Sequence, residues 1–383
     1  MRDAPAADIA VVGGGVIGCA VARALALRGA TVDVLERGVP GREATRAAAG
    51  MLAPWSEPGS RAFLDLALRS LAAYPTWAEA LEEESGLRVG LDISGKLDVA
   101  FHEGEAEALR PAVERAGGAL EWVDRDALRD LEPDLDPAAV GAAWSPSEGS
   151  VDNRLLVRAL WVAAARAGVR FRLGREVVSV APASGGGVRI ALRGGRTLRA
   201  DKAVVAAGAW SGRIGGAPGA LPVRPVRGQM AALSTPDGPR HVVYGPGGYA
   251  LRRGAGLALV GATEEEAGFD NRTTAAGVAA VLGAWARLFP ARAHAALAAT
   301  WSGLRPGTPD GDPILGPHPG GEDVWYATGH FRNGILLAPE TARLCAAALL
   351  DGHAPPRAFR PDRFPRAGEN GGVAGEPSAP LRS

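Results

Sequence analysis

One stretch near the start of the chain, Asp8 to Gly38, constrains the fold more than any other. It begins with a short apolar run, Ile9 to Val12, which predicts a buried parallel strand. Three glycines follow in the spacing G-x-G-x-x-G, and they open an apolar helix expected from Val16 to about Arg28. A second strand is expected from Thr31 to Leu35 and ends at Glu36. This order of elements predicts an α/β fold that binds a dinucleotide.

Each residue of this motif has a physical role at a pyrophosphate. Gly13 permits a tight turn, Gly15 lets the backbone approach the phosphates, and Gly18 lets the helix pack closely on the sheet. The helix N-terminus offers N–H groups and a partial positive charge. Glu36 is placed to bind the ribose hydroxyls and to repel a 2′-phosphate. A glycine-rich turn without function is the alternative in a chain with 53 glycines, but the order of elements favours binding.

The composition bounds the size of the molecule and its partners. A chain of 383 residues is long enough for about two domains. Its 42 basic and 42 acidic residues balance, so the charge indicates no surface for nucleic acid or an anionic membrane. Lys96 and Lys202 are the only lysines, and all other basic residues are arginines. An arginine is therefore a candidate site residue only when it lies inside a specific motif.

The cysteines and the ends of the chain carry further expectations. Cys19 and Cys345 each lie in an apolar helical pattern and are expected to be buried, reduced thiols rather than a disulfide or a metal site. No targeting peptide and no apolar run of about 18 residues is found, so a soluble, cytoplasmic protein is expected. Residues 366–383 are rich in Gly, Pro and Ser and are expected to form a disordered tail.

The hydrophobic pattern predicts two domains built from separated pieces of chain. The Rossmann-like dinucleotide-binding domain is expected to comprise residues 1–85, 149–218 and 303–365. The substrate domain is expected to comprise residues 86–148 and 219–302. The stretch from Val223 to Thr263 alternates with period two, which indicates an antiparallel sheet in this second domain. Further expected elements are a helix at 61–85, a hairpin at 89–101, helices at 275–289 and 291–299, a strand at 324–328 and a helix at 334–351.

The start of the last helix forms a second candidate constellation. The strand at 324–328 leads into His330, and the helix begins at once at Gly334. The N-terminus of this helix carries about half a positive charge and is aimed back toward the glycine motif. Such a dipole suits the pyrimidine end of a flavin, where negative charge accumulates on reduction. An ordinary turn between a strand and a helix is the alternative.

Five motifs together carry a family resemblance. The sequence resembles the glycine oxidase branch of the FAD-dependent D-amino-acid oxidase family, and the resemblance extends to about residue 365. The matching stretches are GGGVIG (Gly13–Gly18), AAAGMLAP (Ala47–Pro54), VVAAGAWSG (Val204–Gly212), LRPGTPDGDPILG (Leu304–Gly316) and GHFRNGILLAP (Gly329–Pro339).

The resemblance implies FAD as cofactor and a set of site residues. The implied FAD contacts, beside the glycines of the motif, are Val16, Ile17, Glu36, Arg37, Ala44, Thr45, Ala49, Gly50, Met51, Val177, His330, Phe331, Arg332, Asn333, Gly334, Ile335 and Leu336. It also implies that Arg305 holds a substrate carboxylate, with Arg332 contributing and Tyr249 donating a hydrogen bond. Glu264 departs from the family pattern, which has an apolar residue there. Its side chain either enters the pocket or points to solvent.

The expected reaction is the oxidation of glycine or a similarly small amino acid. A guanidinium binds a carboxylate with two parallel hydrogen bonds, so Arg305 would orient the substrate Cα–H toward flavin N5 for hydride transfer. The flavin supplies the redox chemistry, O2 would be reduced to H2O2, and no side-chain base is expected, His330 being positional. The resemblance also implies a homotetramer and a hand-off to a thiazole synthase of thiamine biosynthesis.

Three alternatives remain open at this stage. The chain could oxidise sarcosine, proline or a D-amino acid, as an oxidase or a dehydrogenase of the same fold. It could be a non-catalytic flavin-binding subunit, although the presence of both Arg305 and Arg332 disfavours this. It could be an NAD-dependent dehydrogenase, although no nicotinamide motif is found.

Overall fold

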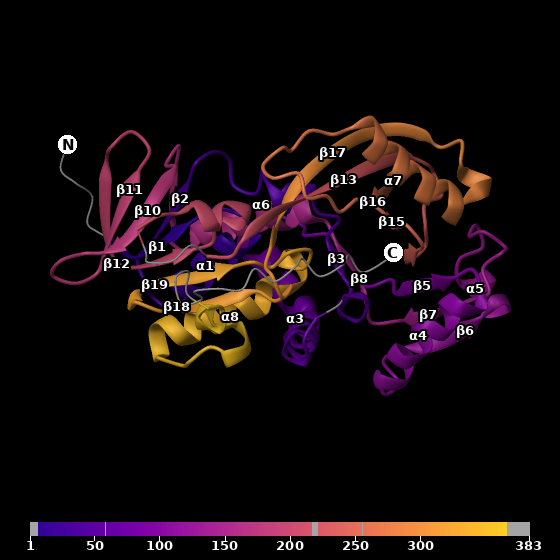
Figure 1. Ribbon diagram of the computed structural model, residues 1–383, viewed down its shortest axis with the longest axis horizontal. Helices are drawn as coiled ribbons and strands as arrows, with labels where there is room; N and C mark the ends of the chain where they lie inside the picture. The colour runs from indigo at the N-terminus through magenta and orange to yellow at the C-terminus, as the bar shows by residue number, and fades with distance from the viewer. Residues whose placement is uncertain (1–6, 58, 217–220, 255, 366–383) are drawn as a thin grey trace, which may run out of the picture.

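The computed structural model describes residues 7–365 except for residues 58, 217–220 and 255. The tail expected at residues 366–383 lies outside the described residues. A parallel sheet forms the centre of one half of the molecule (Figure 1). Its strands follow the order β19 (Gly321–Thr328), β12 (Thr197–Val205), β1 (Ala7–Val12), β2 (Val32–Glu36) and β9 (Arg170–Leu173). Because these strands are parallel, their carboxyl ends meet at one edge of the sheet.

Antiparallel strands extend this sheet beyond β12, whereas the parallel strand β9 ends the order on the other side. The hairpin strands β10 (Val177–Pro182) and β11 (Val188–Leu192) continue it next to β12. Strand β18 (Ile314–His318) pairs with β19. The turn expected at Gly194 and Gly195 joins β11 to β12, and both glycines adopt positive φ there.

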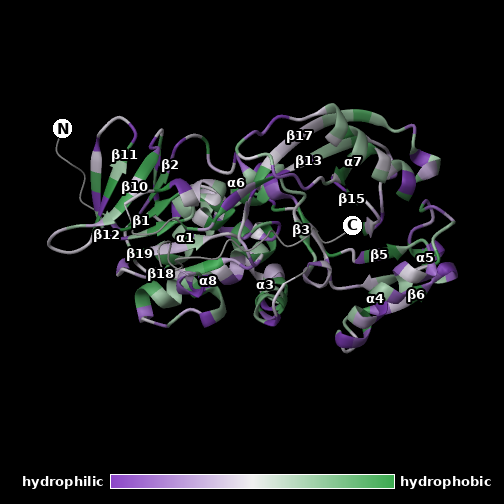
Figure 2. Ribbon diagram, in the orientation of Figure 1, coloured by the Kyte–Doolittle hydropathy of each residue, from purple (hydrophilic) through white to green (hydrophobic). Residues whose placement is uncertain are grey.

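Helices cover one face of the parallel sheet. They are α1 (Val16–Ala26), α3 (Arg61–Ser85), α6 (Asn153–Arg166) and α8 (Gly334–Asp351), with the short α2 (Ala44–Ala47) near the edge. Side chains of β1 alternate between two cores, because Ile9 and Val11 pack with these helices whereas Ala10 and Val12 pack with β10–β12. Figure 2 shows that α8 is largely hydrophobic, which matches its burial between neighbours. Cys19 and Cys345 are both buried free thiols, as predicted.

A second sheet forms the other half of the molecule. Its strand order is β17-β13-β16-β15-β14-β5-β7-β6. Within the described strands of this second sheet, β14 and β5 are parallel and all other neighbours are antiparallel. The strands are β5 (Lys96–Ala100), β6 (Glu121–Asp124), β7 (Gly141–Ser145), β13 (Arg224–Ser234), β14 (Val242–Gly245), β15 (Gly248–Arg252), β16 (Leu257–Gly261) and β17 (Ala296–Gly307). Helix α7 (Ala275–Leu288) packs on β13, β15 and β16. Helices α4 (Glu103–Arg115) and α5 (Arg125–Leu131) lie at the far end.

Two expectations from the sequence were wrong. The helix expected at 291–299 is absent, because a 3-10 turn at Pro290–Arg292 leads into strand β17. This strand pairs with β13 from Ala296 to Gly307, and pairing overrides the helix propensity of its alanines. It also crosses the domain boundary expected at residue 303.

The hairpin expected at 89–101 does not form either. Strand β4 (Leu91–Asp92) joins a small sheet with β8 (Gly149–Val151), which also pairs with β3 (Met51–Leu52), whereas β5 joins the second large sheet.

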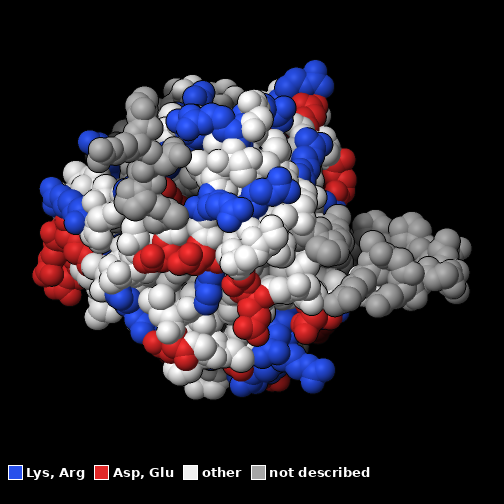
Figure 3. Space-filling view, turned by 90° about the vertical axis from the view of Figure 1, so that its left-hand side faces the viewer, with Lys and Arg blue, Asp and Glu red and all other residues white. Residues whose placement is uncertain are grey.

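Charges of both signs lie side by side on the face drawn in Figure 3, as the balanced composition requires. Among the described residues, no helix is long and apolar enough to cross a membrane.

Candidate active site

A cavity of about 530 Å³ lies where the carboxyl edge of the parallel sheet faces the second sheet. The walls include Gly13, Gly15, Val16, Ile17, Glu36, Arg37, Ala44, Thr45, Ala49, Gly50, Met51, Val177, Tyr249, Glu264, Arg305, His330, Phe331, Arg332, Gly334 and Ile335. Most of the residues that the sequence singled out are therefore brought together. Gly18, Asn333 and Leu336 do not line the cavity.

The turn between β1 and α1 requires its glycines for space. Gly13 has φ +107°, and a Cβ atom there would lie 2.5 Å from the carbonyl oxygen of Ala206. A Cβ atom on Gly18 would lie 1.9 Å from the carbonyl oxygen of Gly13, so Gly18 serves the packing of helix on strand. Gly15 lies at the N-cap of α1 with no side-chain cap. The turn and the start of α1 therefore line the cavity with glycines in place of larger side chains, which fits the pyrophosphate of a dinucleotide.

Glu36 is held at the end of β2 by two backbone groups. Its Oε2 accepts a hydrogen bond of 2.8 Å from Gly14 N, and its Oε1 accepts one of 2.7 Å from Gly38 N. These bonds fix the carboxylate at the cavity wall, where a ribose would lie next to the pyrophosphate. Nearby, the guanidinium carbon of Arg37 lies 3.8 Å from the centre of the Trp210 ring.

Thr45 on α2 contacts the start of α1 directly. Its Oγ1 accepts a hydrogen bond of 3.0 Å from Val16 N. The side chain of Asn153 donates to the carbonyl oxygens of Thr45 and Arg46, at 2.7 and 3.0 Å, and thereby holds α2 against α6. The small residues of this segment leave room for a ligand, because Ala44, Ala47, Ala48 and Ala49 line the cavity.

The N-terminus of α8 closes another side of the cavity. Gly334 and Ile335 line it, and Asn333 at the N-cap makes no capping hydrogen bond. His330 Nε2 lies 3.0 Å from Thr341 Oγ1, and burial lowers the pKa of His330 to about 3. His330 is therefore neutral near pH 7, which agrees with a positional role and leaves it unsuited to act as a base.

Arg305 and Tyr249 reach the cavity from the second sheet. Arg305 lies on β17 and donates from Nη1 to the carbonyl oxygen of Thr263 at 3.0 Å. A Cβ atom on Gly228 would lie 2.2 Å from the same Nη1, so this glycine makes room for the guanidinium. Tyr249 lies on β15, donates to Met230 Sδ at 3.2 Å, and has its pKa raised to about 12 by burial. Burial also lowers the pKa of Arg305, a group whose ordinary pKa lies so high that it stays charged.

Arg332 follows β19 and lies between two carboxylates. Glu57 Oε2 is 3.3 Å from its Nε, and Glu264 Oε2 is 3.9 Å from its Nη1. Among the described residues, no carboxylate lies within 4.0 Å of the Arg305 guanidinium. Arg305 and Arg332 therefore differ in how closely a carboxylate of the protein approaches their charges.

Several site residues were missed by reading the sequence. Gly14 binds Glu36 through its backbone, Trp210 contacts Arg37, and Tyr244 lines the cavity beside Tyr249. Glu57 was missed because it lies three residues beyond the motif Ala47–Pro54. Trp210 could have been predicted from the sequence, because it lies inside the motif Val204–Gly212 that carries the resemblance.

Comparisons with known proteins agree with this site. The family described as FAD dependent oxidoreductase (DAO) matches residues 8–348. The bifunctional protein ThiO/ThiG of Synechocystis sp. is 39% identical over 370 residues, which are 93% of this chain but 54% of that protein, so the chain spans about half the length of this relative.

Two further similarities cover nearly the whole length of both proteins. A glycine oxidase of Geobacillus kaustophilus is 38% identical over 347 residues, 88% of this chain and 92% of that protein. The crystal structure of glycine oxidase from Geobacillus kaustophilus aligns with a TM-score of 0.87 at 37% identity, covering 95% of this chain and 99% of that one. These findings confirm the predicted resemblance, the α/β fold class and the FAD cofactor. With its family match spanning both sheets and the glycine turn, the chain belongs to the FAD dependent oxidoreductase (DAO) family.

Proposed function

We propose that this chain is an oxidase of glycine and similarly small amino acids. The observation that carries the proposal is Arg305, a guanidinium without a nearby carboxylate among the described residues, in the same cavity as the glycine turn. Such a group is set to accept the carboxylate of a substrate through two charge-assisted hydrogen bonds. The similarity to glycine oxidases at 36–38% identity supports glycine as the substrate.

The walls around Arg305 support a small substrate. Tyr244, Tyr249 and Met230 come from neighbouring strands of the second sheet and line the cavity on this side. The hydroxyl of Tyr249 would turn from Met230 to a substrate carboxylate oxygen. The rings of Tyr244 and Tyr249 lie 5.3 Å apart on the adjacent strands β14 and β15, and this pair of rings would border the substrate Cα.

The chemistry divides between the cofactor and the chain. When bound, FAD would supply the redox chemistry, a two-electron oxidation of the amino acid to the imino acid coupled to the reduction of O2 to H2O2. The residues of the chain bind and orient: the α1 turn and Glu36 hold the dinucleotide, and Arg305 holds the amino acid. His330, neutral and bonded to Thr341, fixes the turn before α8 and moves no proton. A substrate amine that binds in its neutral form needs no base from the protein.

The roles of the two halves of the molecule and the fate of the product are part of the same proposal. The half built on the parallel sheet would bind FAD, and the half built on the second sheet would bind the amino acid. The name of the Synechocystis relative joins ThiO with ThiG, which supports a hand-off of the imino acid to a thiazole synthase in thiamine biosynthesis. A homotetramer stays a prediction from the resemblance, and a cytoplasmic location stays a prediction from the sequence pattern.

The absorption spectrum of the purified protein tests the proposal, followed by anaerobic addition of glycine, sarcosine and D-alanine in separate samples. Flavin bands that bleach fastest with glycine are expected. Bleaching by sarcosine or D-alanine but not by glycine would assign the alternative substrates. Bands that resist all three substrates would contradict catalysis and favour a non-catalytic flavin-binding subunit.

A further inference from the structure

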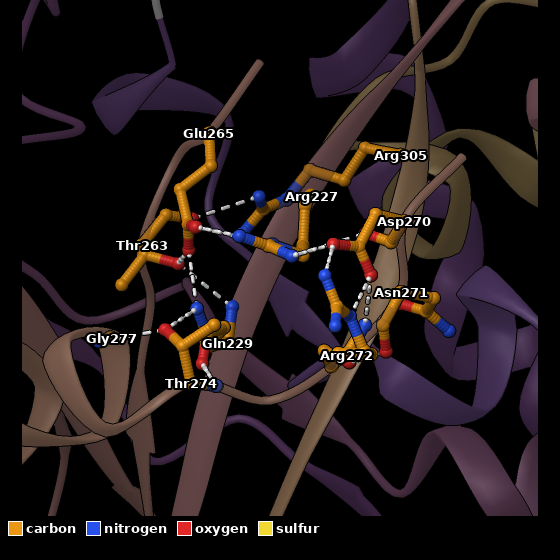
Figure 4. A network of polar contacts seen from close by, with 11 residues as sticks. Arg227, Gln229, Thr263, Glu265, Asp270, Asn271, Arg272, Thr274, Gly277 and Arg305 are labelled. Carbon is orange, nitrogen blue, oxygen red and sulfur yellow. Dashed lines mark hydrogen bonds and ion pairs between the residues drawn. The ribbon is translucent and has the colours of Figure 1, made fainter. Parts of the chain in front are cut away.

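The position of Glu264 is fixed by the residues on either side of it. Thr263 and Glu265 belong to a polar network at the end of β13, which Figure 4 shows together with Arg305. Arg227 and Glu265 exchange two backbone hydrogen bonds of 2.9 Å, and Gln229 N donates to Thr263 Oγ1 at 2.9 Å. The side-chain amide of Gln229 also donates to Glu265 Oε1 at 2.7 Å. The segment is therefore tied to β13 through its backbone and its side chains.

Glu264 itself takes no part in this network and lines the cavity. Thr263 Oγ1 donates to Glu265 Oε1, so these two side chains lie on the same side of the segment. Successive side chains of an extended segment point to opposite sides, which directs Glu264 away from the network. Its Oε2 lies 3.9 Å from Nη1 of Arg332, and its side chain is 55% exposed. Glu264 therefore lines the cavity while more than half of its side chain is open to solvent, so each of the two readings from the sequence describes part of its position.

Two carboxylates lie near the guanidinium groups of Arg305 and Arg332 and offset part of their charge before any substrate binds. Arg305 and Arg332 contribute two positive charges, and Glu57 and Glu264 contribute two negative ones. Arg332 lies within 4.0 Å of both Glu57 and Glu264, whereas Arg305 donates to the carbonyl oxygen of Thr263 and has no carboxylate within 4.0 Å among the described residues. The guanidinium of Arg305 can therefore bind one carboxylate of a substrate. A second carboxylate on the same substrate would meet Glu264, because the guanidinium next to it is already paired.

We propose that Glu264 is a specificity-determining residue that restricts the cavity to amino acids with a single carboxylate and rejects those with two. The proposal rests on the proposed oxidation of small amino acids. Solvent screens the half-exposed Glu264 carboxylate in part, but a second carboxylate placed beside it is still repelled, and repulsion between like charges is a common means of excluding wrong ligands.

The test compares two substrates that differ by one carboxylate. Iminodiacetate is sarcosine with a second carboxylate on its methyl group, so the ratio of their kcat/KM values isolates the effect of that group. The variant Glu264→Gln keeps the size of the side chain and removes its charge. We expect this ratio to rise at least tenfold in Glu264→Gln, chiefly through a lower KM for iminodiacetate.

Glu266→Gln is the matched control. Glu266 stands two residues later, pairs with Arg224, is 63% exposed and does not line the cavity. In Glu266→Gln, the ratio of kcat/KM for iminodiacetate to kcat/KM for sarcosine should stay within twofold of its value in the parent protein. In Glu264→Gln, the guanidinium of Arg332 would accept the second carboxylate once Glu264 no longer pairs with it. The double variant Glu264→Gln with Arg332→Gln should therefore lose the rise in the iminodiacetate-to-sarcosine ratio. An unchanged ratio in Glu264→Gln, or an equal rise in Glu266→Gln, overturns the inference.

A binding measurement separates this inference from the proposed function. Acetate and malonate also differ by one carboxylate, and their binding to the FAD-loaded protein can be followed through the flavin spectrum without turnover. Affinity for malonate relative to acetate should rise at least tenfold in Glu264→Gln and stay unchanged in Glu266→Gln. If the parent protein oxidises neither glycine nor sarcosine, the proposed function fails. The malonate-to-acetate ratio still decides the role of Glu264.

Discussion

The Oε2 atom of Glu57 lies 3.3 Å from Nε of Arg332, so a loop that follows β3 is joined to the turn that begins α8. The Glu57 side chain is 5% exposed, and burial raises the pKa of its carboxyl even though the Arg332 charge opposes the shift. The loop is fixed by its other residues, because Trp55 N donates to Glu148 at 2.9 Å and the Ser56 hydroxyl donates to Asp98 at 3.0 Å. Glu57 thereby offsets the charge of Arg332 from behind the cavity wall.

Replacing Glu57 with Gln should tighten the binding of acetate several-fold, because Arg332 loses a carboxylate that offsets its charge. The fold should persist, since the raised pKa means that burial disfavours the charged form of this group. Acetate titration of the FAD-loaded protein and thermal unfolding measure the two effects. Glu83→Gln, on the exposed side of α3, is the control. Weaker acetate binding would indicate that Glu57 orients Arg332 rather than offsetting its charge.

Replacing Arg305 with Ala should raise the KM for glycine at least about a hundredfold, because two hydrogen bonds to a charged group contribute roughly 1.5–3 kcal/mol each. The FAD content should not change, since Arg305 lies on β17, in the second sheet and away from the glycine turn. Steady-state kinetics measure the KM for glycine, and the ratio of flavin to protein absorbance measures the FAD content. Arg224→Ala removes an exposed arginine at the start of β13 as a control. Normal glycine kinetics in Arg305→Ala would refute the proposed carboxylate site.

Replacing Tyr249 with Phe should lower kcat/KM for glycine at least about tenfold, because a hydrogen bond to a charged carboxylate contributes roughly 1.5–3 kcal/mol. The difference between the parent protein and Tyr249→Phe should stay constant from about pH 7 to 10, since burial raises the pKa of Tyr249 to about 12 and its hydroxyl remains protonated. Tyr326→Phe, a substitution in the core beside β12, is the control. A difference that disappears near pH 10 would show that the phenol ionises in the assay range.

His330 should make the protein less stable at acidic pH. Burial lowers its pKa to about 3, whereas the histidine of an unfolded chain titrates near pH 6.5. Between these values the unfolded chain binds a proton that the folded chain does not, so the free energy of unfolding decreases as the pH falls, by up to about 1.4 kcal/mol per pH unit. Thermal unfolding from pH 7 to 5 should therefore depend less on pH in His330→Gln. The exposed His353→Gln should behave like the parent protein.

Replacing Glu36 with Gln should weaken FAD binding about tenfold, because the carboxylate that Gly14 and Gly38 hold in place would lose its charge at the ribose. FAD retained after gel filtration and a titration of the apoprotein measure this. Glu103→Gln, exposed at the start of α4, is the control. Equal FAD retention in Glu36→Gln and the parent protein would place the ribose elsewhere.

The unit β1–α1–β2 could be predicted from the sequence because its determinants are local. The apolar strand, the glycine spacing and the helical period act over fewer than about 30 residues, and the observed bounds of α1 differ from the expected ones at the C-terminal end alone. The candidates Arg305, Tyr249 and Arg332 came from the resemblance of their motifs, and the fold places all three in one cavity.

Other features were decided by contacts between distant residues. The segment from Ala296 reads as a helix by itself, and only the pairing with β13, some 60 to 80 residues earlier, makes it a strand. Likewise, β4 and β5 are adjacent in the chain but pair with different sheets. The roles of Glu57 and Glu264 depend on distances to Arg332, which is 275 and 68 residues away in the sequence. Local propensity and spacing determine which elements a segment favours, whereas hydrogen-bond pairing and charge placement across the fold determine which partner each side chain meets.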